Sequence, residues 1–485
     1  MPGRSEKEPL EPELRALIGI LLVGLVAVLL DTTIVNVATA RLAKDLHTGV
    51  SVVQWVSTGF LLALGVSIPL TAWAVGRFGG RSVWLAGVAL FTVGSVLAGV
   101  SWDIGSLIAF RVVQGLGGGL MLPVQQTLLV RAAGPARLGR LMAAISLPAV
   151  VVPILGPVVG GLILQAASWR WIFVINVPIG LVAFVLAWRG LDRDRDRQRR
   201  PLDVAGLVLF VPGVIAVLYA LTRVAQLGTQ QGTWVPLALG VLLLAGFAVY
   251  AARVGDAAMI DVRLFRVPSF AGSSVLLFLS GLSLYGVAFL LPLFYQQVCG
   301  YSALTAGLLL TPQGIGSLAA RRSVGKLSDR YGSRPVVLAG LACALVGSLP
   351  FGWAGVHGGQ VPQIAGLLVR GAGLSAVNIA VMVAAYQGLS KDRIPHASST
   401  TRILLQVGGS FGVAVAAVVL QHELAGHPGG PAAHASGFGA AFLWMTALTV
   451  VAVPPALMLP GRRRPEPVAA TAAPPVTPAG SEAQS

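Results

Sequence analysis

Charged side chains are scarce in this sequence, and acidic ones are the scarcest. Only 11% of the 485 residues are charged, with 18 Asp and Glu against 34 Lys and Arg. Soluble domains carry a charge on about a quarter of their residues, so this composition excludes an ordinary soluble protein. The hydrophobic fraction is 55% and the mean hydropathy is +0.81. These values predict a polytopic membrane protein.

Cysteine and histidine are also rare, and their positions exclude several kinds of site. Cys299 falls near a predicted outer loop and Cys343 inside a predicted helix, so we expect no disulfide between them. The six histidines form no HExxH or similar pair, which disfavours an intramembrane metalloprotease. No serine–histidine or paired-carboxylate arrangement falls at membrane depth. The sequence therefore predicts no metal site, no cofactor and no enzyme.

Long apolar runs recur along the whole chain. A helix needs roughly 20 such residues to cross the hydrocarbon core. The runs are apolar on all faces, unlike the alternating strands of a membrane β-barrel, so we predict an all-α fold with about fourteen membrane helices. Their predicted ranges are 16–38, 52–74, 83–101, 105–127, 140–165, 170–188, 203–223, 233–252, 270–292, 303–320, 335–355, 361–386, 403–421 and 438–459.

Lysine and arginine alternate between the two sides of the predicted membrane. They gather in the N-terminal tail and in every second loop, whereas the intervening loops hold little more than Arg41, Lys44, Arg170 and Arg223. The positive-inside rule then places both termini in the cytoplasm, with the chain in the inner (plasma) membrane. The basic runs are interpreted as topological anchors, so the net charge of +16 predicts no nucleic-acid partner.

A repeated motif divides the chain into two halves. GRFGGRSVW at 76–84 follows the second predicted helix, and GKLSDRYGSRPVV at 325–337 follows the second of the last six. FRVVQGLGGG and VRGAGLSAVN form another matching pair, in corresponding helices of the two halves. We predict a cytoplasmic tail at 1–15, a six-helix bundle at 16–189, a charged linker with two additional helices at 190–268, a six-helix bundle at 269–460 and a disordered cytoplasmic tail at 461–485.

Seven motifs occur in order along the predicted helices. They are LLDTTIVNVA, QWVSTGFLLALG, RVVQGLGGG, ILGPVVGG, SWRWIFVINVPIG, LPLFYQQVCGYSALTAGLLLTPQG and ASSTTRILLQVGGSFGVAV. Together they resemble the major facilitator superfamily and, within it, the fourteen-helix drug:proton antiporters. The resemblance implies two six-helix bundles with two inserted helices, and transport by alternating access about a central site.

Asp31 is the one acidic residue that falls well inside a predicted helix. A carboxylate at that depth costs about 2.5–3.5 kcal/mol on insertion scales, and such groups usually face a bundle interior or a water-filled path. Arg111 on the fourth helix is the expected partner, with Gln114 one turn away. We interpret Asp31 and Arg111 as the proton-coupling pair. A static ion pair that only ties helices together is the alternative.

Two further motifs predict parts that move during transport. Gly156, Pro157, Gly160 and Gly161 form the antiporter motif, in which proline removes a backbone hydrogen bond and glycine lets helices approach closely. Ordinary small-residue packing is the alternative. The predicted cytoplasmic gate comprises Arg77, Gly79, Arg81, Asp329, Arg330, Gly332 and Arg334.

The first gate motif departs from the family pattern. Gly76 stands where the resemblance implies an aspartate, whereas the second copy retains Asp329. Either the part of the cytoplasmic gate in the first half is weaker or differently built, or Asp329 holds the gate for both halves.

The predicted function is proton-coupled export of amphipathic or cationic compounds such as drugs or antibiotics, by a monomer in the lipid bilayer with the proton motive force as energy source. Export of an endogenous metabolite, lipid or siderophore is one alternative, and a receptor or scaffold that does not transport is another. The candidate substrate contacts are Gln54, Trp55, Gln114, Tyr285, Tyr295, Gln296, Gln313 and Asn378.

Overall fold

The computed structural model describes residues 12–192, 201–227, 231–353, 359–390, 393–426 and 431–461. These residues are almost entirely helical and contain no β-strand. Thirteen helical segments among them are long and apolar enough to cross a membrane, and a shorter apolar stretch lies at Val151–Ala166. The predicted all-α membrane fold is therefore confirmed.

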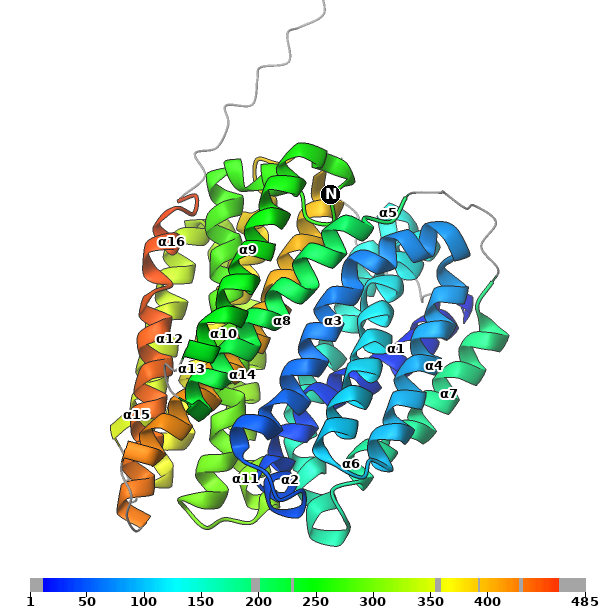
Figure 1. Ribbon diagram of the computed structural model, residues 1–485. Coiled ribbons are helices and arrows are strands. Elements are labelled where there is room, and N and C mark those ends of the chain that lie inside the picture. The colour runs from blue at the N-terminus through cyan, green and yellow to red at the C-terminus, as the bar shows by residue number, and fades with distance from the viewer. Residues whose placement is uncertain are drawn as a thin grey trace, which may run out of the picture.

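The N-terminal bundle occupies one side of the molecule (Figure 1). Its elements are α1 (Pro12–Ile34), the 3₁₀ helix η1 (Val35–Ala38), α2 (Thr39–Asp45), α3 (Val50–Phe78), α4 (Gly80–Gly99), α5 (Ile104–Ala166), α6 (Trp171–Val174) and α7 (Asn176–Gly190).

The segments predicted at 105–127 and 140–165 belong to one helical element, α5. Arg111 near its start bonds to Asp31 of α1, and Gly156 near its end lies against Thr33, two residues further along α1. A straight helix rising 1.5 Å per residue would separate positions 111 and 156 by about 68 Å. The chain of α5 therefore turns back between them and supplies two crossings. The two predicted ranges imply a non-helical loop between them. That expectation is wrong, because the backbone between the two crossings is helical.

The C-terminal bundle lies on the opposite side in Figure 1. Its elements are α10 (Pro268–Gln297), α11 (Ala303–Tyr331), α12 (Ser333–Trp353), α13 (Gln360–Tyr386), α14 (Ile394–Gly426), α15 (Pro431–Val450) and α16 (Val453–Leu457).

Two helices connect the bundles, α8 (Val204–Leu227) and α9 (Gln231–Val254). They pack against each other, and α8 also contacts α3 and α14, one helix from each bundle. Val214 of α8 shares a buried apolar cluster with Leu62 of α3 and Val407 of α14. In this way α8 lies over the seam where α3 and α14 meet.

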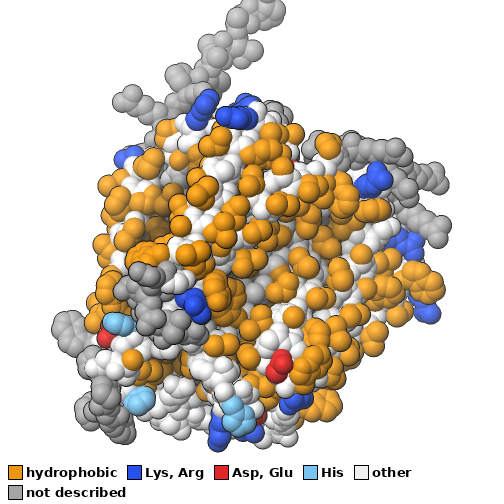
Figure 2. All heavy atoms as spheres, viewed as in Figure 1, with side chains coloured by type: hydrophobic (Ala, Val, Ile, Leu, Met, Phe, Trp, Pro, Cys, Tyr) orange, Lys and Arg blue, Asp and Glu red, His pale blue; other side chains and the backbone are white. Residues whose placement is uncertain are grey.

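The surface of the molecule is that of a protein solvated by lipid. Hydrophobic side chains cover most of the face in Figure 2, and Lys and Arg gather mainly near its two ends. Val235 and Leu242 of α9, for example, are 69% and 72% exposed. Soluble monomers rarely leave large continuous apolar patches uncovered, whereas the hydrocarbon core of a bilayer suits them.

Asp203 joins three segments at the start of the connecting helices. Its carboxylate accepts hydrogen bonds of 2.7 Å from the backbone N–H of Gly206, the Tyr250 hydroxyl and the backbone N–H of Met259. The first contact caps α8, and the other two reach α9 and the segment that follows it.

We predict that Asp203→Ala lowers the melting temperature of the purified protein. Each hydrogen bond to a charged acceptor contributes about 1.5–3 kcal/mol, and the substitution removes three of them. Tyr250→Phe removes only one, so its loss should be smaller in the same thermal unfolding measurement in detergent. An Asp203→Ala variant that melts with the unmodified protein would show that the carboxylate does not hold these segments.

Candidate functional site

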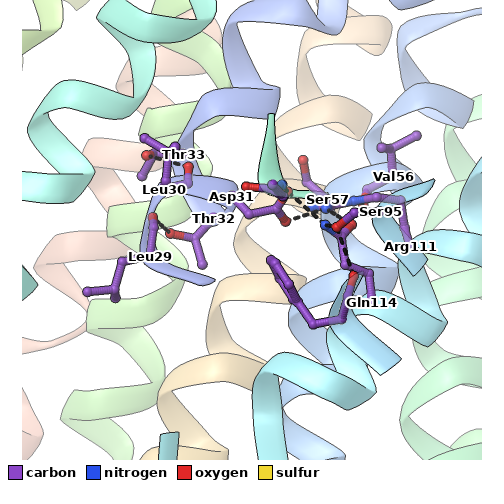
Figure 3. Close-up of polar contacts among 12 residues, drawn as sticks. Leu29, Leu30, Asp31, Thr32, Thr33, Val56, Ser57, Ser95, Arg111 and Gln114 are labelled. Carbon is purple, nitrogen blue, oxygen red and sulfur yellow. Dashed lines mark hydrogen bonds and ion pairs between the residues drawn. The ribbon is translucent and has the colours of Figure 1, made fainter. Parts of the chain in front are cut away.

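The centre of the N-terminal bundle contains a buried carboxylate with three side-chain donors. Asp31 of α1 has no exposed surface, and its Oδ2 accepts the ion-pair hydrogen bond from Nη1 of Arg111. Its Oδ1 accepts from Nε2 of Gln114 at 3.0 Å and from Nδ2 of Asn176 at 2.9 Å. Figure 3 shows Asp31, Arg111 and Gln114 converging between the helices that carry them. These contacts repay the cost of burying the charge.

Arg111 is held on all sides within the bundle and is 1% exposed. Its Nη1 also donates to Oε1 of Gln114 at 2.5 Å, and its Nε donates to the carbonyl of Val56 at 3.1 Å. The guanidinium lies 4.1 Å from the ring centre of Phe60 and 5.5 Å from that of Phe173, as in cation–π contacts. Arg111 therefore faces the bundle interior.

Gln114 extends the network to a further helix, because its Nε2 also donates to Oγ of Ser95 in α4 at 2.7 Å. The network thus joins α1, α3, α4, α5 and α7. Among the described residues, the other ion pair within 4 Å is the exposed Arg41–Asp45 pair of α2.

Asn176 is a member of this network that sequence reasoning missed. It lies in SWRWIFVINVPIG, where it carries no charge to mark it. The residue is fully buried at the start of α7, and its Oδ1 has no hydrogen-bond partner among the described residues. The sequence feature that could have identified Asn176 is its amide side chain at the break between two apolar helices.

A cavity of about 400 Å³ lies between the two bundles. Its walls are mostly apolar, and Asp31 does not line it, although the adjacent Thr32 and Thr33 do. The polar lining residues are Thr32, Thr33, Asn36, Tyr285, Gln313, Ser317, Arg321, Ser375, Asn378 and Gln406.

Three of the eight predicted substrate contacts line this cavity, namely Tyr285, Gln313 and Asn378. The structure places the other five elsewhere. Gln114 belongs to the charge network, Tyr295 is buried among aromatic rings of the C-terminal bundle, and Trp55 packs in the apolar cluster under α8.

The remaining two glutamines make structural contacts. Nε2 of Gln54 donates to Oγ1 of Thr222 in α8 at 3.4 Å, and Nε2 of Gln296 donates to the carbonyl of Val37 at 3.0 Å. Amide side chains serve as well for joining helices as for binding a ligand, so residue type alone could not separate these roles.

The antiporter motif makes close helix–helix contacts near the end of α5. A Cβ added to Gly156 would collide with the Thr33 side chain, and one on Gly160 would lie 2.9 Å from the carbonyl oxygen of Ile34. On Gly161 it would lie 2.5 Å from Cα of Leu304 in α11. The motif therefore packs α5 against α1 in its own bundle and against α11 in the other.

The two gate motifs have matching backbones and matching partners. Gly79 and Gly332 have φ of +87° and +88°, values that favour glycine, in the turns after α3 and α11. Nη2 of Arg81 donates to the carbonyl of Trp188 near the end of α7 at 2.5 Å. Nε of Arg334 donates to the carbonyl of Leu459, just after α16, at 2.9 Å. Each arginine thus binds the end of the last helix in its own half, where cations are favoured.

The other gate residues are at the surface. Arg77, Asp329 and Arg330 are exposed, and the Arg330 guanidinium lies 5.3 Å from the ring centre of Tyr331. Within the described residues Asp329 makes no ion pair within 4 Å. In this conformation Arg81 and Arg334 each bind within their own half, and Asp329 forms no ion pair between the halves among the residues described.

In addition to the contact between α3 and α14, the bundles meet at the end of the molecule away from the Gly79 and Gly332 turns. Near the start of α11, Gly161 packs against Leu304, and Nε2 of Gln165 donates to Oγ of Ser302 at 3.3 Å. The cavity lining continues along α11 to Arg321, towards the Gly332 turn. The cavity is therefore closed at one end and extends towards the gate turns.

Two helical bundles around a central, mostly apolar cavity define a membrane transporter. The chain matches the Major Facilitator Superfamily over residues 21–413, and it belongs to this family. It is 36% identical to "Multidrug resistance protein B homolog" of Mycobacterium tuberculosis over 87% of this chain and 78% of the relative. It is 32% identical to "Probable transport protein HsrA" of Haemophilus influenzae, over 81% and 84%.

Solved transporter structures share the fold. A bacterial homolog of the human lysosomal transporter Spinster, inward-facing and unoccupied, aligns with a TM-score of 0.65 at 13% identity, covering 93% of this chain and 97% of the other. The xylose transporter XylE from E. coli aligns with a TM-score of 0.60 at 12% identity, covering 91% and 98%.

We predict that Gly161→Ala separates α5 from α11 at the closed end, because the added methyl would meet backbone that cannot move aside. The measurement is the rate of disulfide formation between Gln165→Cys and Ser302→Cys in a background with Cys299→Ser and Cys343→Ser. Gly161→Ala should slow cross-linking. Gly19→Ala is the matched control, since nothing lies within 4 Å of a Cβ added there. Equal rates in both variants would contradict the role assigned to Gly161.

Proposed function

We propose that this protein is a proton-coupled antiporter that exports amphipathic organic compounds, drugs or antibiotics among them, by alternating access. The observation that carries the proposal is the carboxylate of Asp31, buried at membrane depth one residue from the cavity lining. Intramembrane acids of this kind are costly and usually belong to proton or ion pathways. The multidrug-resistance name of a 36% identical relative supports the substrate class.

Protonation of Asp31 is the proposed coupling step. A neutral carboxyl no longer pairs with the charge of Arg111, which keeps Gln114 and the Val56 carbonyl as hydrogen-bond acceptors. Arg111 therefore remains partly satisfied in both states of the acid. The exchange of an ion pair for a neutral contact changes the force between α1 and α5, which carry the two residues.

The antiporter motif provides the route from this pair to the interface between the bundles. Thr33 and Ile34 follow Asp31 on α1 and pack directly against Gly156 and Gly160. Gly161 is the next residue of α5 and packs against α11. A shift of α1 is thus passed through three glycines to the contact that closes one end of the cavity.

The proposed orientation places both termini in the cytoplasm of a cell whose inner membrane contains the protein as a monomer. Arg77, Arg81, Arg330 and Arg334 surround the two gate turns, and the positive-inside rule favours the cytoplasmic side for them. With this orientation the cavity extends towards the cytoplasm and is closed on the outside, which is the inward-facing state of an exporter ready to load substrate.

We predict that Asp31→Asn abolishes pH-driven accumulation while substrate binding persists. Asparagine keeps the size and hydrogen bonding of the side chain, but it does not titrate. Arg111 retains its neutral acceptors and two aromatic rings, so we expect the variant to fold. The measurement is uptake into proteoliposomes with an imposed pH gradient, together with binding on the same sample.

Asp45→Asn is the matched control, because it removes an exposed carboxylate from α2 and should leave uptake unchanged. Full pH-driven accumulation by Asp31→Asn would eliminate Asp31 as the coupling residue. A variant that fails to fold would instead support a purely structural ion pair, whose disruption costs roughly 3–5 kcal/mol.

A further inference from the structure

The charges around the central cavity are unbalanced. Arg321 of α11 is the one charged side chain among the described lining residues. It is exposed and forms no ion pair within 4 Å with any residue that the structure describes. The nearby carboxylate of Asp31 does not offset it, because Asp31 is fully buried and already paired with Arg111.

A second cation lies directly behind the cavity wall. Arg370 of α13 occupies the place that the sequence repeat matches to Arg111, and it is 1% exposed. Unlike Arg111, it has no carboxylate partner in the described part of the chain: Nη1 donates to Oε1 of Gln313 and Nη2 to the carbonyl of Ser283, both at 2.9 Å. Its Nε has no partner among the described residues. A buried guanidinium without a counter-charge is unfavourable, and a bound anion would supply that charge.

Gln313 connects this buried charge to the cavity. It lines the cavity, and its Oε1 is occupied by the hydrogen bond from Arg370. The amide nitrogen of the same side chain is its remaining polar group, and it is a hydrogen-bond donor. A donor polarised by a cation behind it is suited to a negatively charged group.

Arg402 adds a third cation next to the site. It lies one turn before Gln406, which lines the cavity, and its Nη2 donates to the neutral Oε1 of Gln126 at 2.8 Å. Within the described part of the chain, Arg321 in the lining and Arg370 and Arg402 beside it thus have no carboxylate within 4 Å. Uncompensated positive charges of this kind favour a negatively charged ligand.

We propose that the cavity selects amphipathic organic anions, such as hydrophobic carboxylates, over cations of the same shape. Arg321 attracts the anion at the end towards the gate turns. The Gln313 amide, backed by Arg370, receives its charged group about 12 Å deeper, two turns back along α11. The apolar body packs against lining residues such as Leu284 and Leu291. This inference names the substrate class of the proposed exporter and rests on the cavity being its transport site.

The test compares two matched probes, 1-pyrenebutyrate and a pyrenebutyl trimethylammonium ion. Binding is measured on the full protein in nanodiscs, and empty nanodiscs of the same lipid are subtracted. We expect the unmodified protein to bind the carboxylate about tenfold more tightly than the ammonium ion, because like charges placed together oppose binding. Equal affinities, or tighter binding of the ammonium ion, would overturn the proposal.

Two variants locate the selectivity, and both keep the charge of Arg370, although Gln313→Leu removes one of its hydrogen-bond acceptors. Arg321→Gln and Gln313→Leu should each weaken carboxylate binding severalfold and leave ammonium binding equal or stronger. Lys326→Gln is the matched control, because it removes an exposed positive charge from the same helix outside the cavity lining. If Arg321→Gln and Gln313→Leu both behave like Lys326→Gln, the anion does not bind where we place it.

A transport measurement separates this inference from the function on which it rests. pH-driven accumulation of the ammonium probe without carboxylate binding would overturn anion selectivity and leave proton-coupled transport standing. Carboxylate binding that depends on Arg321, without pH-driven transport of either probe, would support the anion site and contradict the proposed antiport.

Discussion

The ion pair between Asp31 and Arg111 is the interaction on which the N-terminal bundle depends. Each charge alone would be costly to bury, and together they recruit Gln114 and Asn176, so that the acid is tied to α5 and α7. The same short stretch of α1 carries Thr33 and Ile34, against which the glycines of α5 pack. Electrostatics and close packing therefore act on one segment, and neither can change without affecting the other.

The halves of the molecule share a backbone plan but differ in their charges. Gly79 and Gly332 adopt the same backbone angle, and Arg81 and Arg334 bind equivalent helix ends. The buried arginines do not match: Arg111 has a carboxylate, and Arg370 has only neutral oxygens. A pseudo-symmetric scaffold thus contains, among the described residues, one buried arginine with a counter-charge and one without.

The sequence predicted what depends on local chemistry. Long apolar runs indicate membrane helices. A carboxylate within such a run is costly unless it is paired, and this reasoning identified Asp31 and predicted Arg111 as its partner. The residues that line the cavity could not be predicted, because they depend on how each helix is rotated about its axis when it packs against its neighbours. Gln54 and Gln313 are the same residue type in apolar helices, yet one joins α3 to α8 and the other faces the cavity. Arg321 and Gln406 were missed for the same reason.

The position of α8 makes the two seams between the bundles unequal as routes from the bilayer. On one side, α8 lies over the junction of α3 and α14, and their apolar side chains form a common cluster. On the other side, α5 and α11 meet directly through glycine contacts, and no described connecting helix packs over both of them. A compound dissolved in the lipid that approaches α3 and α14 meets a packed helix first. A compound that approaches α5 and α11 meets only the contact between these two helices. Lateral entry from the lipid to the cavity is therefore less obstructed on the α5–α11 side than on the α3–α14 side.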